Sequence, residues 1–263
     1  MSDRLSRPER RILQRQDEQF LDRPLILSGD PRSMAAHIRQ VVKLLKSPTE
    51  TSPCSAATLH LATLYDRTVP ASAAPLLACK RGCYHCCTQM VTVMAPEAFL
   101  VAATIRRRTK TVAAVFEADT KTRALSLDER LKAHVRCPLL DDTVCSVYAA
   151  RPLGCHAFIS TSLAACLGAF ERDEVPNIPM PGDYVSIVHA CRMVLVAAMR
   201  LAGLRDATFE LNAALAVILA DENAEVRWLK GEDIFASLEA GPPPPSGIDQ
   251  SVREMMAFVA PTL

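Results

Sequence analysis

The residues of this sequence best suited to chemistry are its cysteines, of which there are ten in 263 residues. Eight of them form two groups, one dense and one spread over about thirty residues. Thiolates two to four residues apart can close a turn around one soft cation. This density is too high for cysteines that only fill a core. We therefore interpret the eight as metal ligands: Cys79, Cys83, Cys86, Cys87, Cys137, Cys145, Cys155 and Cys166.

The number of thiols limits the kind of metal centre. Four thiolates saturate one tetrahedral Zn²⁺ or one four-iron cluster. Eight thiolates are enough for two such centres, or for one centre with the other thiols free for redox reactions. The side chains of the adjacent Cys86 and Cys87 diverge in extended backbone. We expect them either to serve two nearby centres or to divide between ligand and free thiol.

The start of the chain and its apolar runs indicate a reducing compartment. The first twenty residues are polar throughout, unlike a secretory signal. The best candidate for a membrane span, residues 185–202, carries His189, Arg192 and Arg200. We therefore expect a cytoplasmic protein without a membrane span, in which ten cysteines are no disulfide framework.

Other residues near the cysteines could be structural or could take part in the chemistry of the site. His85 and His156 could ligate a metal through nitrogen, or donate a hydrogen bond to a thiolate. Arg151 is interpreted as structural, hydrogen-bonding carbonyls or thiolates near the site. Tyr148 is expected to pack over the site.

Cysteines outside the two groups are interpreted differently. Cys54 stands alone at the start of an expected helix, and Cys191 lies in an apolar helical stripe. Both are expected to be core residues, since buried cysteines behave as small hydrophobes. His189 is expected on a helix surface or in the core.

The cysteine pattern also resembles a known family. The strings ACKRGCYHCC, CPLL and CSVYAARPLGC, followed by Cys166, are similar to the CxxCxxCC cysteine-cluster family over about residues 78–170. Its members are described as zinc- or iron-chelating and include a flagellin lysine N-methylase. The resemblance implies that the same eight cysteines form the cluster. Because the methylase is a larger protein, its activity is not transferred.

Two departures from the family pattern affect the ligand set. The first two cysteines are separated by three residues, where the family commonly has two. His156 stands after the RP-x-x-C cysteine, where the family usually has arginine. That change removes a cation and adds a nitrogen that could bind metal.

Three functions fit the cysteines. The first is an iron–sulfur protein with a redox or radical-type role, slightly favoured by the thiols beyond four. The second is a zinc-binding structural or interaction module. The third is a metal carrier or thiol-redox protein. Phosphate-binding loops, H-E-x-x-H and G-x-S-x-G are missing from the sequence, so kinase, dehydrogenase and ordinary hydrolase activities have no support, and no catalytic residue is assigned.

The charge balance bears on partners. Thirty basic residues against 29 acidic ones give a net charge of +1. So small a net charge gives no strong positive electrostatic potential that would attract nucleic acid or an anionic membrane, so neither is expected as a main partner. A protein partner is left open, because the helices outside the cysteine region could carry a partner surface or simply complete the core.

Composition and capping signals predict a mainly α fold. Glycine is scarce, with 9 residues, and aromatics are only 5%, which favours helices over sheets. Asp30-Pro31 and Ser52-Pro53 are typical helix starts. The expected helices lie near 31–46, 53–67, 184–202, 207–221 and 249–259, with another from Pro96, and the best strand signal is Met90 to Val93.

These elements predict an irregular helical domain whose cysteine-rich loops converge on a metal cluster. We expect an N-terminal helical region at 1–78, a cysteine-cluster domain at 79–170 and a C-terminal helical region at 171–263 that packs on it. Linkers are expected at 69–78, 173–183 and 241–247, where prolines recur. Convergence requires Cys79 and Cys155 to lie close together.

Overall fold

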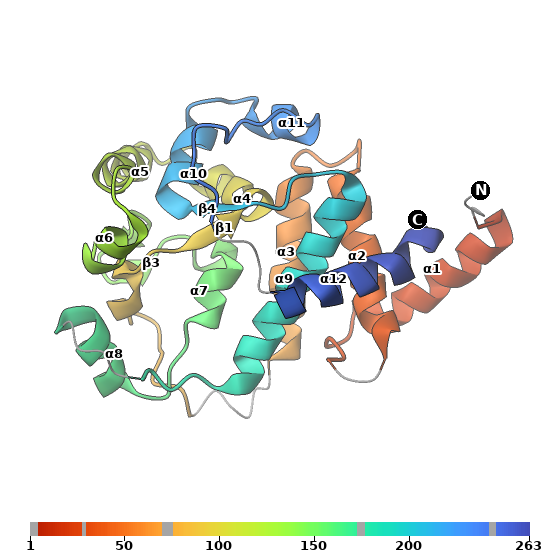
Figure 1. Ribbon diagram of the computed structural model, residues 1–263, viewed down its shortest axis with the longest axis horizontal. Coiled ribbons are helices and arrows are strands. Elements are labelled where there is room, and N and C mark those ends of the chain that lie inside the picture. Colours follow the sequence, from red (N-terminus) through yellow and green to blue (C-terminus); the bar gives the residue numbers. More distant parts are fainter. Residues whose placement is uncertain (1–4, 28–29, 70–75, 173–176, 242–245) are drawn as a thin grey trace.

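Helices dominate the computed structural model of the chain, which describes residues 5–27, 30–69, 76–172, 177–241 and 246–263 (Figure 1). Three of them form its centre: α2 (Pro31–Leu45), α3 (Pro53–Thr68) and α9 (Gly182–Ala202), each of which packs on the other two. The expected mainly α fold is confirmed.

Helix starts follow the capping chemistry in the sequence. The carboxylate of Asp30 accepts a hydrogen bond from the backbone N–H of Arg32 at 2.9 Å, and Pro31 follows at the first helical position. Ser52 and Pro53 repeat this arrangement at α3. At the other end of α9, Gly203 adopts φ 77°, a left-handed conformation that glycine enters without strain.

The remaining helices surround this centre. α1 (Arg7–Leu21) packs on α2, and α12 (Ser246–Val259) on α9 and α2. α4 (Ala95–Ile105) contacts α3 and α10 (Leu211–Leu219), and α5 (Thr109–Thr122) covers α10. The shorter elements are α6 (Leu127–Lys132), α7 (Leu153–Ala157), α8 (Leu163–Glu171), α11 (Ala224–Leu229) and the 3₁₀ turns η2 (His85–Thr88), η3 (Tyr148–Ala150) and η4 (Ala260–Thr262).

Two short antiparallel pairs complete the fold. β1 (Thr92–Met94) pairs with β4 (Thr208–Glu210), with Val93 opposite Phe209. The predicted strand at Met90–Val93 is thus displaced by one to two residues, and the helix expected from 207 begins at Leu211 because β4 precedes it. β2 (Leu140–Asp141) pairs with β3 (Val144–Cys145) in a hairpin. Most of residues 111–134 lie in the two helices α5 and α6.

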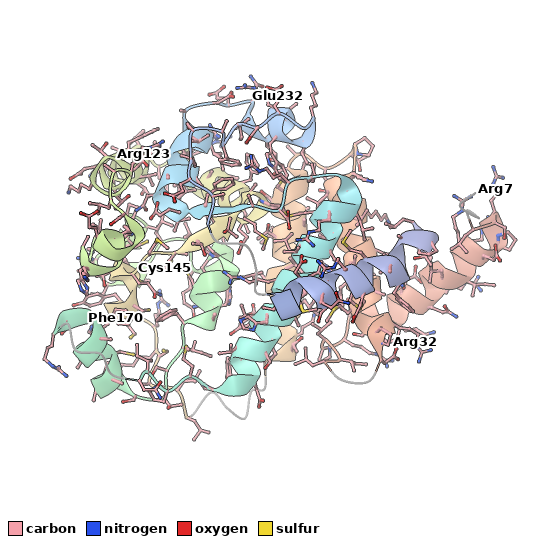
Figure 2. All side chains as sticks on the ribbon, in the orientation of Figure 1. Arg7, Arg32, Arg123, Cys145, Phe170 and Glu232 are labelled. Atoms are coloured by element: carbon pink, nitrogen blue, oxygen red, sulfur yellow. The ribbon has the colours of Figure 1, made fainter. Side chains whose placement is uncertain are left out.

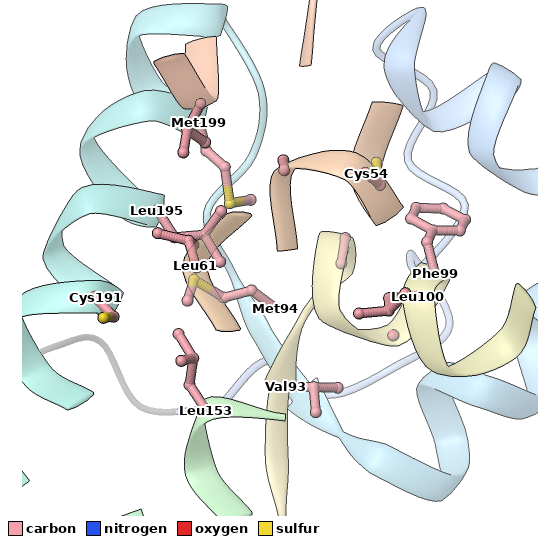
Figure 3. Packing of buried hydrophobic residues seen from close by; sticks show 14 of the residues in the cluster. Cys54, Leu61, Val93, Met94, Phe99, Leu100, Leu153, Cys191, Leu195 and Met199 are labelled. Carbon is pink, nitrogen blue, oxygen red and sulfur yellow. The ribbon is translucent and has the colours of Figure 1, made fainter. Parts of the chain in front are cut away.

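One hydrophobic core draws residues from all three predicted regions. Figure 3 shows Leu61 of α3, Met94 before α4, Leu153 of α7 and Leu195 and Met199 of α9 pointing toward one another. The proposed division at 79 and 171 stays a prediction. Parts of the expected linkers, at 70–75, 173–176 and 242–245, lie outside the described residues.

The long apolar helix α9 belongs to this core. Among the described helices it is the one long and apolar enough to cross a membrane, and 50% of its most apolar window is buried inside the protein. Its buried side includes Ile187, Val194 and Leu195, which face α2, α3 and α7.

Candidate metal centre

A tight turn presents the first cysteines. The backbone N–H of Cys83 donates to the carbonyl of Lys80 at 2.9 Å, and Gly82 within the turn has φ 87°. A side chain at that position would be strained, so the glycine allows the turn. The chain then enters η2, where the N–H of Cys87 donates to the carbonyl of Tyr84 at 2.8 Å. Cys86 and Cys87 therefore sit on one 3₁₀ turn.

A hairpin presents two cysteines of the second group. Cys137 precedes β2 and accepts from the N–H of Leu140 at 3.2 Å through its carbonyl. Cys145 lies on β3, opposite Leu140 in the hairpin register. Asp142 between the strands has φ 52°, the conformation that closes such a turn. The hairpin thus brings Cys145 back alongside the segment that carries Cys137.

The last two cysteines lie on short helices. Cys155 is the third residue of α7, which starts after Pro152. The first N–H of that helix, on Leu153, donates to the buried carboxylate of Glu97 at 2.7 Å. Cys166 is a buried residue of α8. Figure 2 shows Cys145 and Phe170, the latter from α8, on the side of the molecule opposite α1.

Three backbone contacts join the two groups. The N–H of Cys137 donates to the carbonyl of Cys87 at 2.7 Å. The N–H of Ser160 donates to Sγ of Cys79 at 3.3 Å, while the carbonyl of Ser160 accepts from Ala78 at 2.8 Å. α8 packs on η2, so Cys166 is brought to the turn that carries Cys86.

Seven of the eight grouped cysteines line one cavity of about 360 Å³. Cys79 and Cys155 are both on its wall, and their close approach stays a prediction. Cys166 lies outside the lining but close enough for the charges of Cys86 and Cys83 to raise its pKa, after the larger effect of burial. The cysteines on the wall are Cys79, Cys83, Cys86, Cys87, Cys137, Cys145 and Cys155.

Mutual effects on pKa divide the thiols into two sets. Burial raises the pKa of Cys79, and the charges of Cys86 and Cys166 raise it further. The pKa of Cys83 is raised by burial and then by Cys79 and Cys86. We name Cys79, Cys83, Cys86 and Cys166 the first thiol set.

The second thiol set comprises Cys87, Cys137, Cys145 and Cys155. Burial raises the pKa of Cys137 to about 11, and Cys145 adds to the shift. Burial also raises the pKa of Cys155, followed by the charges of Cys137 and Cys145 and then of Cys86. Cys87 is assigned here by its backbone contact with Cys137. A hydrogen bond between the adjacent thiols raises the pKa of Cys86, so the two sets meet at Cys86 and Cys87.

The thiols are ligands of the type that a soft, thiophilic cation prefers, but they are not already arranged around one ion position. Buried thiols with raised pKa values stay protonated at neutral pH, and a soft cation that binds them displaces those protons. Among the described residues, no three His, Cys, Asp or Glu side chains already surround one ion position. The thiols therefore share a cavity, and closing around an ion requires them to move. The predicted convergence on a metal cluster stays a prediction.

The two candidate histidine ligands are engaged elsewhere. Nδ1 of His85 lies 2.6 Å from a carboxylate oxygen of Glu171 on α8. His156 is buried, its Nε2 accepts from Nε of Arg151 at 3.3 Å, and burial lowers its pKa to about 3. Nδ1 of His156 has no hydrogen-bond partner among the described residues. Both contacts favour supporting roles over direct ligation.

The other singled-out residues agree with expectation only in part, since Arg151 donates to Nε2 of His156 and not to a carbonyl or a thiolate. Arg151 lines the cavity, and its guanidinium carbon Cζ lies 4.1 Å from the ring centre of Tyr148. Tyr148 is on the cavity wall but 59% exposed, so it sits at the rim rather than over the thiols. Cys54 and Cys191 are fully buried in the core, which confirms their interpretation, and His189 is exposed on α9.

The sequence did not indicate that three further residues belong to the site. Ser160 bonds the Cys79 sulfur through its backbone, which any residue could do. Glu97 marks a helix start, but its second bond to Leu153 spans 56 positions. Arg130 lies in a weakly periodic stretch and enters the cavity wall only through folding.

Residues 78–176 match the model of the CxxCxxCC family, described as a "Putative zinc- or iron-chelating domain". The chain carries a CxxCxxCC domain. The match contains all eight grouped cysteines and excludes Cys54 and Cys191. No curated protein matches the chain, and neither does a solved structure. Metal binding through cysteines is therefore the property that the CxxCxxCC domain contributes, while the two flanking regions lie outside the match.

Proposed function

We propose that the CxxCxxCC domain holds an iron–sulfur cluster through its grouped thiols and serves a redox or radical-type role. The observation that carries this proposal is the shared cavity of about 360 Å³, lined by seven half-buried thiols. The sulfur ligands of one zinc ion each lie about 2.3 Å from it and so crowd together. In an iron–sulfur cluster the thiolates bind separate iron atoms and stand further apart. A cavity with several thiols on its wall leaves room for such a cluster, which supports this proposal.

The two thiol sets support two centres rather than one. Each set has four members, the number that one four-iron cluster or one zinc ion takes. Cys86 and Cys87 are adjacent on one 3₁₀ turn, with a hydrogen bond between their thiols, so they lie where the two sets meet. Their adjacency would keep the centres close together.

Several groups of this chain would tune such a centre. A bound cluster supplies one-electron transfer. The N–H of Ser160 donates to the Cys79 sulfur, and the Arg151 guanidinium lies on the same cavity wall. Hydrogen bonds and positive charge near the sulfurs stabilise the more reduced, more negative state and raise the potential. Burial limits the access of water to the thiols.

Zinc is the second candidate, and one observation favours it. The turn at Lys80–Cys83, closed by the 2.9 Å backbone bond, holds two thiols of the first thiol set on a single loop. Closed zinc sites use such close spacing, and their binding energy contributes directly to folding. A structural or interaction module, or a metal carrier, would follow from zinc.

Metal analysis separates these candidates. We expect protein purified without oxygen to be brown and to contain iron and acid-labile sulfide in comparable amounts. About two zinc ions per chain without sulfide would overturn the cluster in favour of the zinc module. Absence of both metals after anaerobic reconstitution would exclude either function.

Substitutions test the two thiol sets. Cys83→Ala and Cys145→Ala each remove one ligand from one set, so we expect each variant to lose about half of the bound metal. Cys191→Ala is the matched control, because this cysteine is buried in α9 outside the cavity. Metal is measured by inductively coupled plasma mass spectrometry on protein checked by circular dichroism. Full metal content in both cavity variants would contradict the assignment.

A further inference from the structure

Arg130 stands out on the cavity wall because its charge is buried. The residue lies on α6, and its side chain is only 5% exposed. Arg130 lines the same cavity as the thiols, on the part of the wall that also carries Glu210 and Asn212. A guanidinium removed from water needs hydrogen-bond acceptors for its five N–H groups.

Most of those groups have no acceptor. Nη2 lies 3.4 Å from Oε1 of Glu210, a long ion pair. The other oxygen of Glu210 already accepts from the N–H of Ala213 at 2.9 Å. Nε and Nη1 of Arg130 have no hydrogen-bond partner among the described residues, thiols included. Unmade bonds to a buried charge are costly, so a folded protein seldom leaves them open.

Another buried arginine of this chain shows the contrast. The side chain of Arg39 is 11% exposed, and its guanidinium binds both carboxylate oxygens of Asp17 and the hydroxyl of Thr262. The fold supplies acceptors for this guanidinium, although Nε of Arg192 on α9, outside the cavity lining, also lacks a partner among the described residues. Arg130, on a cavity wall, is left with donors available to something that enters the cavity.

The surroundings indicate the chemistry of that ligand. Two N–H donors of a guanidinium suit a planar oxyanion, above all a carboxylate. The rest of the cavity lining is largely apolar and includes Val91, Leu139, Leu140 and Leu211. An apolar lining with a few placed polar groups is typical of small-molecule sites. The ligand would combine a carboxylate with a short apolar body.

We propose that this cavity is also a binding site for a small organic carboxylate, held by Nε and Nη1 of Arg130 beside the second thiol set. Glu210 orients the guanidinium through Nη2, which leaves the other donors turned to the ligand. The site shares the cavity with the metal centre but does not require either metal. A molecule bound there would lie next to the thiols of Cys137 and Cys145.

Hexanoate is a suitable probe, with 1-hexanol and inorganic phosphate for comparison. Binding is measured by isothermal titration calorimetry on the full chain, both as isolated and after metal removal under reducing conditions. We expect saturable binding of hexanoate in both forms, and at least tenfold weaker binding of 1-hexanol, which lacks the carboxylate. No saturable binding of hexanoate, or equal binding of the alcohol, would overturn the proposal. Phosphate binding without hexanoate binding would do the same.

Variants assign the binding to Arg130. Arg130→Met should weaken hexanoate at least tenfold, and Arg130→Lys, which keeps the charge, should weaken it less. Arg123→Met is the control outside the cavity, since that side chain is 41% exposed and pairs with the largely buried Asp119 of α5, and its affinity for hexanoate should be unchanged. Circular dichroism checks that each variant is folded.

Metal content distinguishes failure of this site from failure of the metal centre. Arg130→Met should keep its metal while it loses hexanoate. If Arg130→Met loses metal and the unaltered protein binds no hexanoate, Arg130 serves the thiolates alone and the proposal is wrong. If the protein takes up no metal even after anaerobic reconstitution but still binds hexanoate, this site stands and the proposed function is wrong.

Discussion

Two histidines, the buried His37 of α2 and the half-buried His60 of α3, form a pair between these helices. Nδ1 of His37 lies 3.0 Å from Nε2 of His60. Burial, followed by the charge of His60, lowers the pKa of His37 to about 3, and burial lowers that of His60 to about 4. One ring donates and the other accepts, which requires at least one neutral imidazole. The pair therefore holds α2 to α3 in its uncharged form.

This pair predicts acid sensitivity. The unfolded chain takes up protons on both rings below about pH 6.5, whereas the folded chain does so only near their lowered pKa values. The contribution of this pair to the free energy of unfolding should be constant above pH 7 and fall by about 1.4 kcal/mol per pH unit for each proton as pH drops from 6.5 toward 4. Urea unfolding at a series of pH values measures this slope.

Substitution isolates the contribution of the pair. His60→Gln should make the slope between pH 6.5 and 4 shallower, because one titrating ring is gone. His189→Gln changes an exposed histidine of α9 and should leave the slope as it is. An unchanged slope in His60→Gln would show that the acid sensitivity arises elsewhere.

The cysteine-bearing helix α7 depends on its connection to α4. Glu97 accepts from the N–H of Met94 at 2.8 Å with one oxygen and from the N–H of Leu153 at 2.7 Å with the other. The carboxylate is buried, so its burial raises the pKa, and the two amide bonds oppose that rise. One side chain thereby caps α4 and anchors the first turn of α7, two residues before Cys155.

Removal of this carboxylate should destabilise the fold. Glu97→Ala leaves two buried amides without acceptors, at about 1–3 kcal/mol each, so we expect a loss of several kcal/mol. Glu129→Ala removes the same kind of capping glutamate from an exposed position on α6 and should cost only about 0.5–1 kcal/mol. Guanidinium unfolding compares the two variants, and equal costs would contradict a special role for Glu97.

At the scale of the whole molecule, the thiol cavity adjoins the helical core without forming its centre. The fully buried residues of α2, α3 and α9 lie in that core, while Cys79, Cys137 and Cys145 are half-buried at its margin. The core can therefore persist when the thiols lose their metal.

Metal removal should loosen the thiol region and spare the helices. A metal at a hundred times its Kd stabilises the folded state by about 2.7 kcal/mol, so chelation should lower Tm by several degrees. Far-UV circular dichroism should retain most of its helical signal. Proteolysis should become faster within residues 79–87 and 137–166. Complete loss of helicity on chelation would show instead that the metal holds the whole fold.

Local signals account for the parts of the structure that the sequence predicted well. Asp30-Pro31 and Ser52-Pro53 mark helix starts because a cap and a proline act within one turn. The stripe of α9 and the burial of Cys54 and Cys191 follow from apolar spacing. The start of α10 was misplaced because β4 exists only through pairing with β1, which lies more than 110 positions earlier.

The sequence alone determined that the chain is mainly helical and that eight cysteines, by type and spacing, are suited to a soft metal. Those properties depend on neighbours within a few residues. The tertiary structure decided that seven of the thiols line one cavity and that Arg130 lies on the same wall. These arrangements arise from contacts between distant segments, such as Cys87 with Cys137, and no local pattern encodes which buried charge is left without a partner.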